Sequence, residues 1–102
     1  MTAKEFLLAI PDQVQAESIE GMSTLFHFDI DGEGLSVKVE NGIVDVTEGF
    51  KGDPKCIVKS TNDNFMGIVN GEVNPTIAVL TGKVKINNPS ELIKYAKSLG
   101  IV

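Results

Sequence analysis

Features that define several common protein classes are missing from this chain of 102 residues. It has one cysteine, Cys56, so it can form no intrachain disulfide and no multi-cysteine metal site, and the single thiol suits a reducing compartment. No apolar run approaches the length that spans a bilayer. The N-terminal segment is too short, and too acidic afterwards, for a secretory signal. We therefore expect a soluble cytoplasmic protein.

Positive charge is also scarce. Nine lysine and arginine residues stand against 14 aspartate and glutamate residues, which gives a formal net charge of −5. Binding to nucleic acid needs clustered basic side chains that neutralise phosphates, and strong attraction to an anionic membrane needs the same. The composition therefore disfavours nucleic acid as a partner and predicts at most transient membrane contact.

The remaining composition is typical of one globular domain, which we expect to span residues 1–102. Hydrophobic residues make up 42% of the chain and charged residues 23%, values that disfavour disorder. A capping box of Thr2 and Glu5 begins a helix that Pro11 should kink or split, and a second helical stretch should run to Gly21.

Strands are predicted where the hydrophobic period changes to two. Alternating apolar residues indicate strands over 25–30, 35–40, 43–47 and 55–60, and the short Gly-containing turns between them favour antiparallel pairing. Helices at 60–71 and 74–82, a strand at 83–87 and a helix at 88–100 follow. This order predicts an α+β fold, with a mostly antiparallel five-stranded sheet covered on one face by helices.

An acidic stretch, "DIDGEGLSVKVE", resembles a calcium-binding loop. Asp29, Asp31, Glu33 and Glu40 occupy loop positions one, three, five and twelve, with Gly34 at position six. An EF-hand loop lies between helices, whereas both flanks here alternate with the period of a strand. The stretch is therefore interpreted as a β-hairpin with a solvated tip, and no metal site is predicted.

Catalytic patterns are weak. His27 and Cys56 fall on nearby strands and could form an imidazole–thiolate pair, but no third member of such a site is evident, and no catalytic residue is assigned. "TGKVK" lacks the upstream glycine and the Ser or Thr of a phosphate-binding loop. Lys83 and Lys85 are better interpreted as the exposed face of a strand, where they could meet an anionic ligand head group.

The last forty residues are rich in apolar side chains, and one motif among them is informative. "GEVNPTIAVLTGKVKI" resembles the signature of the sterol carrier protein type 2 domain, the non-specific lipid-transfer family, at Gly71, Asn74, Pro75, Ala78, Gly82, Lys83, Lys85 and Ile86. The order of predicted elements resembles that family over almost the whole chain. The chain departs from the family pattern at Asn88, where glycine is common, and at Val79 and Leu80, where phenylalanine is frequent.

The resemblance implies a non-enzymatic carrier without a cofactor, holding a fatty acid, an acyl-CoA or a similar lipid in an apolar cavity between sheet and helices. The lining expected from it is Phe26, Phe28, Phe65, Met66, Val69, Ile77, Leu80, Ile86, Leu92, Tyr95, Ala96 and Leu99. If the opposite face of the first strand forms the floor, Leu25 and His27 replace Phe26 and Phe28. The alternative function is an accessory protein–protein interaction domain of the same fold with a collapsed cavity. The oligomeric state is left open.

Overall fold

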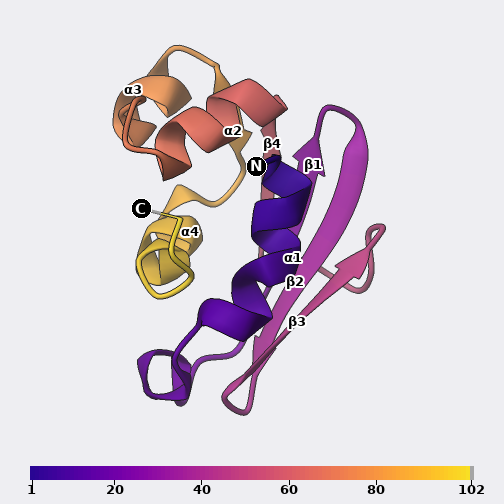
Figure 1. Cartoon of the computed structure of the whole chain (residues 1–102). Helices are drawn as coiled ribbons and strands as arrows, with labels where there is room; N and C mark the ends of the chain where they lie inside the picture. The colour runs from indigo at the N-terminus through magenta and orange to yellow at the C-terminus, as the bar shows by residue number, and fades with distance from the viewer. Residues whose placement is uncertain (102) are drawn as a thin grey trace.

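The structure, a computed structural model that describes residues 1–101, contains five strands and the predicted order of elements (Figure 1). The elements are α1 (Ala3–Gln13), a 3-10 turn η1 (Ala16–Ile19), β1 (Thr24–Ile30), β2 (Glu33–Glu40), β3 (Ile43–Glu48), β4 (Cys56–Ser60), α2 (Asn62–Val69), α3 (Pro75–Leu80), β5 (Val84–Ile86) and α4 (Pro89–Ala96). The α+β class is therefore confirmed.

The sheet is mixed, which corrects the prediction of mostly antiparallel pairing. Its strand order is β3-β2-β1-β4-β5. The β3/β2, β2/β1 and β4/β5 pairs are antiparallel, but β4 lies beside β1 and runs parallel to it. The sequence predicts a short turn between β3 and β4, but the segment 49–55 instead carries the chain across β2 and β1 to the other side of the sheet.

This crossover is physically possible without a helix because its segment is long enough. Seven residues can reach about 23 Å, whereas β3 and β4 are separated by three interstrand spacings, about 14 Å. The segment lies on the face of the sheet opposite the helices. There, the Lys51 N–H donates to Ser36 Oγ at 2.8 Å, and the Lys51 carbonyl accepts a 2.8 Å hydrogen bond from His27 Nε2. Polar side chains on the outer face thus fix the strand order.

Helix α1 passes through Pro11 without the predicted split. It begins with the predicted capping box, in which the Glu5 N–H donates to Thr2 Oγ1 and the Thr2 N–H donates to Glu5 Oε1. Pro11 lies in the last turn, so the backbone hydrogen bond that it cannot donate is near the end of the helix. The last hydrogen bond of the helix runs from the Val14 N–H to the Ile10 carbonyl at 3.0 Å. The expected second helix is only the 3-10 turn η1.

The helices and the apolar face of the sheet enclose the core. Helix α1 packs on β2 and β3, α3 contacts β5 and α4 contacts β4, so the helices cover different parts of one face (Figure 1). An aromatic cluster joins these parts: Phe65 of α2 meets Phe6 and Phe28 edge-on at 6.0 and 5.7 Å between ring centroids, and Phe26 meets Tyr95 of α4 at 5.9 Å. Within the described residues, no helix is long and apolar enough to cross a membrane.

Candidate functional site

An apolar pocket of about 350 Å³ lies between the sheet and the helices of the C-terminal half. It is lined by side chains from β4, α2, α3, β5, α4 and the segment after α4: Val58, Phe65, Ile68, Pro75, Thr76, Val79, Val84, Ile86, Leu92, Ile93, Ala96 and Ile101. Thr76 is the one polar side chain in this set, and none of the lining residues is charged. This size and composition are typical of sites that hold the apolar part of a small molecule.

The floor of the pocket follows from strand register. Val58 of β4 pairs with Ile86 of β5, and Val58 also pairs with Phe28 of β1, so the three side chains share the face toward the helices. Lys59 and Lys85 occupy the alternate positions and are exposed on the other face. The alternation of "CIVKS" and "KVKIN" therefore supplies an aliphatic floor on one side and a charged surface on the other.

The roof of the pocket depends on the short helix α3. The Asn74 side chain caps this helix by accepting from the Thr76 and Ile77 N–H groups at 2.9 and 3.2 Å. Gly82, with φ of 77°, ends the helix, and the Lys83 N–H then donates a 2.9 Å hydrogen bond to the Ala78 carbonyl. These two caps fix the rotation of α3, which buries Ala78 against the core and turns Thr76 and Val79 toward the pocket.

The residues predicted to line a cavity occupy three kinds of position. Four of them line this pocket: Phe65, Ile86, Leu92 and Ala96. Five are buried in the adjoining core, namely Phe26, Phe28, Met66, Tyr95 and Leu99, and Val69 is half-buried against it. The floor uses the face of β1 that carries Phe26 and Phe28, since His27 and Leu25 lie on the opposite face.

Two predicted lining residues are placed outside the pocket. Ile77 and Leu80 are 57% and 80% exposed, on the side of α3 that faces away from it. Other lining residues were not predicted: Val58, Ile68, Pro75, Thr76, Val79, Val84, Ile93 and Ile101. For Val58 and Val84 a signal existed, because strand alternation places them on the same face as Ile86. For the residues of α3 the sequence offers no such signal, because six residues are too few to define an apolar face by periodicity.

The imidazole–thiolate pair does not form. Cys56 pairs with Phe26 and shares its buried face, whereas His27 lies on the opposite face of the sheet, against Phe50 and the Lys51 carbonyl. The Cys56 thiol donates to the Asn88 carbonyl at 3.4 Å, and burial raises the pKa of this thiol to about 11. A buried, protonated thiol is a poor nucleophile.

The acidic stretch folds as the predicted hairpin. Strands β1 and β2 pair antiparallel from Thr24 and Val39 to Ile30 and Glu33, with Asp31 and Gly32 in the turn at φ of 52° and 85°. Asp31 Oδ2 accepts the Asn62 N–H at 2.8 Å, so this carboxylate fixes the start of α2. No cluster of three or more metal-ligating side chains occurs within residues 1–101.

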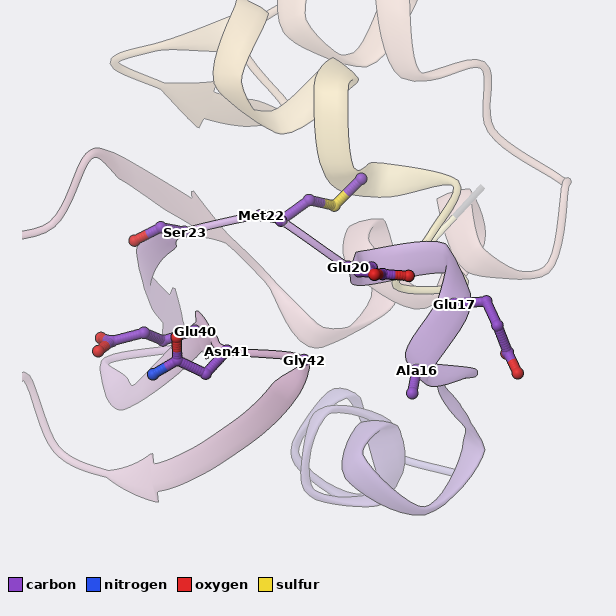
Figure 2. Close-up of a pocket in the computed structure, with 9 residues that line it drawn as sticks. Ala16, Glu17, Glu20, Met22, Ser23, Glu40, Asn41 and Gly42 are labelled. Atoms are coloured by element: carbon purple, nitrogen blue, oxygen red, sulfur yellow. The ribbon is translucent and has the colours of Figure 1, made fainter.

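A larger hollow, of about 750 Å³, lies between η1 and the β2–β3 turn (Figure 2). Its lining includes Glu17, Glu20 and Glu40 together with Asn41 and Gly42. Figure 2 shows the three carboxylate side chains pointing in different directions rather than toward a common point. Such a surface repels an anionic ligand and provides little apolar area, so the smaller pocket is the better binding site.

These features define a small α+β domain with an apolar pocket between a mixed sheet and the helices that cover one of its faces. The chain belongs to the SCP-2 sterol transfer family, whose sequence model matches residues 3–98. No curated protein was found to match the chain.

Solved structures of similar fold come from diverse sources. The inverting sec-alkylsulfatase Pisa1 of Pseudomonas sp. matches with a TM-score of 0.82 and 15% identity over 100% of this chain, which spans only 16% of the sulfatase. The palmitated SCP2L2 of Aedes aegypti matches with a TM-score of 0.69 and 15% identity over 92% of each chain. The apo sterol carrier protein 2 of Yarrowia lipolytica matches with a TM-score of 0.65 and 26% identity over 95% of this chain and 84% of that one.

Proposed function

We propose that this protein is a non-catalytic lipid carrier that holds the acyl chain of a fatty acid, an acyl-CoA or a similar lipid in the pocket between β4, β5 and the helices α2, α3 and α4. The observation that carries the proposal is the pocket itself, about 350 Å³ of space with an aliphatic and aromatic lining. Membership in the SCP-2 family supports it, as does the structural neighbour from Aedes aegypti described as palmitated. The proposed site of action is the cytoplasm, and residues 1–102 act as one domain.

The driving force for such binding is removal of acyl chain from water. Each buried methylene contributes about 0.8 kcal/mol, so ten methylenes give roughly 8 kcal/mol before the entropy lost on association is subtracted. The pocket contains no charged side chain that would have to be desolvated. The chemistry of the lining therefore selects for the apolar part of a lipid and leaves the polar head at the opening, beside Thr76 and Ile93.

Ile93 marks this opening because it lines the pocket while 75% of its surface remains exposed. Helix α4 carries Ile93, Leu92 and Ala96, so a small displacement of α4 from α3 would widen the entrance. Three hydrogen bonds hold the beginning of α4 to the sheet and to the residue before β4. They run from the Thr24 hydroxyl to the Glu91 carboxylate, from the Cys56 thiol to the Asn88 carbonyl and from the Asn88 side-chain amide to the Lys55 carbonyl. We propose α4 as the element that moves when a ligand enters.

An accessory protein–protein interaction domain is the second candidate function. It is supported by the alkylsulfatase, a much longer enzyme in which a domain of this fold accounts for 16% of the chain. A collapsed cavity would suit that function, whereas the open pocket supports the carrier.

A matched pair of tryptophan variants tests the carrier proposal. Val79→Trp places a bulky ring in the pocket, whereas Ile77→Trp places the same ring on the exposed side of the same helix. Displacement of a fluorescent fatty acid should show that Val79→Trp binds at least about tenfold more weakly than the wild type, whereas Ile77→Trp binds with wild-type affinity. A tenfold loss of affinity corresponds to about 1.4 kcal/mol.

Native mass spectrometry of the gently purified wild-type protein provides the second measurement. We expect retained acyl lipid in the wild type and in Ile77→Trp, and none in Val79→Trp. A wild-type protein that purifies empty and displaces no fluorescent fatty acid would contradict the carrier and favour the accessory domain.

A further inference from the structure

Aromatic rings close the apolar pocket on the side that faces α1 and β1. Phe65 lines the pocket, and its ring meets Phe6 and Phe28 edge-on, at 6.0 and 5.7 Å between centroids. Phe28 in turn lies 5.9 Å from Phe26, which meets Tyr95 of α4 at the same centroid distance. Rings packed at this spacing leave no passage for an acyl chain. A chain in the pocket therefore ends at these rings and does not continue under α1.

The segment that follows α4 forms a second wall of the pocket. The Ile101 N–H donates to the Ala96 carbonyl at 2.9 Å, and the Gly100 N–H donates to the Lys97 carbonyl at 3.2 Å. Gly100 has φ of 78°, a left-handed conformation that glycine adopts without strain. This pair of hydrogen bonds around a left-handed glycine reverses the chain at the end of a helix. The reversal returns Ile101 to the side of Ala96.

Ile101 occupies space at the pocket that a ligand could otherwise use. Both Ile101 and Ala96 are buried, and both line the pocket. An apolar contact between these two positions commonly accompanies a helix end of this kind. Here the contact also places the whole isoleucine side chain, three carbons larger than that of alanine, in the pocket wall.

The volume enclosed by these walls limits the length of a bound chain. A methylene group takes about the volume of a water molecule in the liquid, about 30 Å³. The pocket volume of about 350 Å³ therefore holds at most about twelve carbons. The lining contains no charged side chain, so a carboxylate stays outside this volume. Carbons beyond the limit remain in water at the opening and contribute little to binding.

We propose that the pocket selects medium-length acyl chains, of up to about twelve carbons, and that Ile101 sets this limit from the side of α4, as Phe65 does from the side of α2. The proposal rests on the proposed carrier function and names the class of lipid that the carrier holds. Shorter chains leave part of the lining in contact with water and bind more weakly. Longer chains bind no more tightly than a chain that fills the pocket.

A series of saturated fatty acids of six to eighteen carbons tests the limit. Each acid displaces a fluorescent fatty acid from the wild type, below the concentration at which it forms micelles. Each added methylene that enters the pocket should strengthen binding by about fourfold. We expect this gain up to about twelve carbons and then a plateau. A gain that continues with the same slope to eighteen carbons would overturn the limit and leave the carrier standing. A protein that binds none of the acids would contradict the carrier itself, and the limit with it.

Two variants of the second wall should move the plateau in opposite directions. Ile101→Ala removes three carbons from the wall and should shift the plateau to chains about three carbons longer. Ala96→Val adds two carbons to the same wall and should shift the plateau to chains about two carbons shorter. A loss of folding stability common to both variants cannot produce opposite shifts. A wild-type plateau in either folded variant would overturn the role of Ile101, and Ala96→Val alone decides it where Ile101→Ala does not fold.

Leu99→Ala is the matched control for Ile101→Ala. Leu99 is as buried as Ile101 but lies outside the apolar pocket, on a separate hollow beside Val14 and Ser18. The control should lose stability in urea unfolding, as Ile101→Ala does, and keep the wild-type plateau. An equal shift of the plateau in Leu99→Ala would show that chain length follows stability rather than the pocket wall, and would overturn the proposal.

Discussion

Replacement of Phe65 by alanine tests whether this ring closes the inner end of the pocket. Phe65 is 3% exposed; it lines the pocket on one side and packs edge-on against Phe6 and Phe28 on the other. Its removal opens space toward α1 and β1. Ligands with longer acyl chains should then gain affinity relative to shorter ones.

The stability cost can be estimated from the packing around the ring. Phe→Ala changes in a core cost about 3–5 kcal/mol, and the lower end applies because one side of this ring already faces the pocket rather than packed atoms. A loss of about 3 kcal/mol leaves a typical domain folded. A ligand present at a hundred times its Kd restores about 2.7 kcal/mol, so a chain that fills the new space should almost cancel the loss.

The assay is urea unfolding of wild type and Phe65→Ala with a series of fatty acids of increasing chain length. The chain length that stabilises most should be longer for the variant than for the wild type. Leu7→Ala is the matched control, because Leu7 is fully buried on α1 without lining the pocket. It should lose about 2–5 kcal/mol and keep the wild-type chain-length preference. An unchanged preference in Phe65→Ala would refute the reasoning that this ring limits the pocket.

Three further predictions concern the fold. Burial raises the pKa of Cys56 to about 11, so about a thousandth of this thiol is ionised at pH 8. Ellman's reagent should therefore label Cys56 only after unfolding, and fast labelling of the native protein would contradict its burial. Thr61→Ala removes the cap whose Oγ1 accepts the Asn64 N–H at 3.1 Å and should cost about 1 kcal/mol in urea unfolding, whereas Thr61→Ser should retain most of that stability. Lys4→Met should leave the stability at pH 7 almost unchanged, because the ion pairs of Lys4 are exposed. The pKa of Glu48 is lowered mainly by its hydrogen bond to Lys4, so any stabilisation is lost as the pH falls through that lowered pKa. A large loss of stability in urea unfolding at neutral pH would refute this.

The order of elements could be predicted from the sequence because each element carries its own local signal. The capping box at Thr2 and the alternation around Phe26 and Phe28 need no information from distant residues. The position of β4 beside β1 could not be predicted in this way. It depends on the crossover 49–55, which Ser36 and His27 hold on the outer face through hydrogen bonds formed only in the folded chain.

The same distinction explains which site residues could be predicted. Strand residues such as Ile86 obey strict alternation, so their face follows from the sequence once the sheet is assigned. The orientation of α3 instead depends on the Asn74 cap and on the Gly82 terminus, which rotate Val79 inward and Leu80 outward. Both residues are aliphatic, and hydrophobicity alone does not distinguish between them.

The fold separates the part that provides stability from the part that leaves room for a ligand. Helix α1 with β1, β2 and β3 forms a closed core, in which Leu7, Ile10, Val37 and Val39 are almost fully buried. The pocket lies in the other part, under α2, α3 and α4, and the aromatic cluster around Phe65 forms the boundary. Empty space in the second part therefore leaves the packing of the first intact.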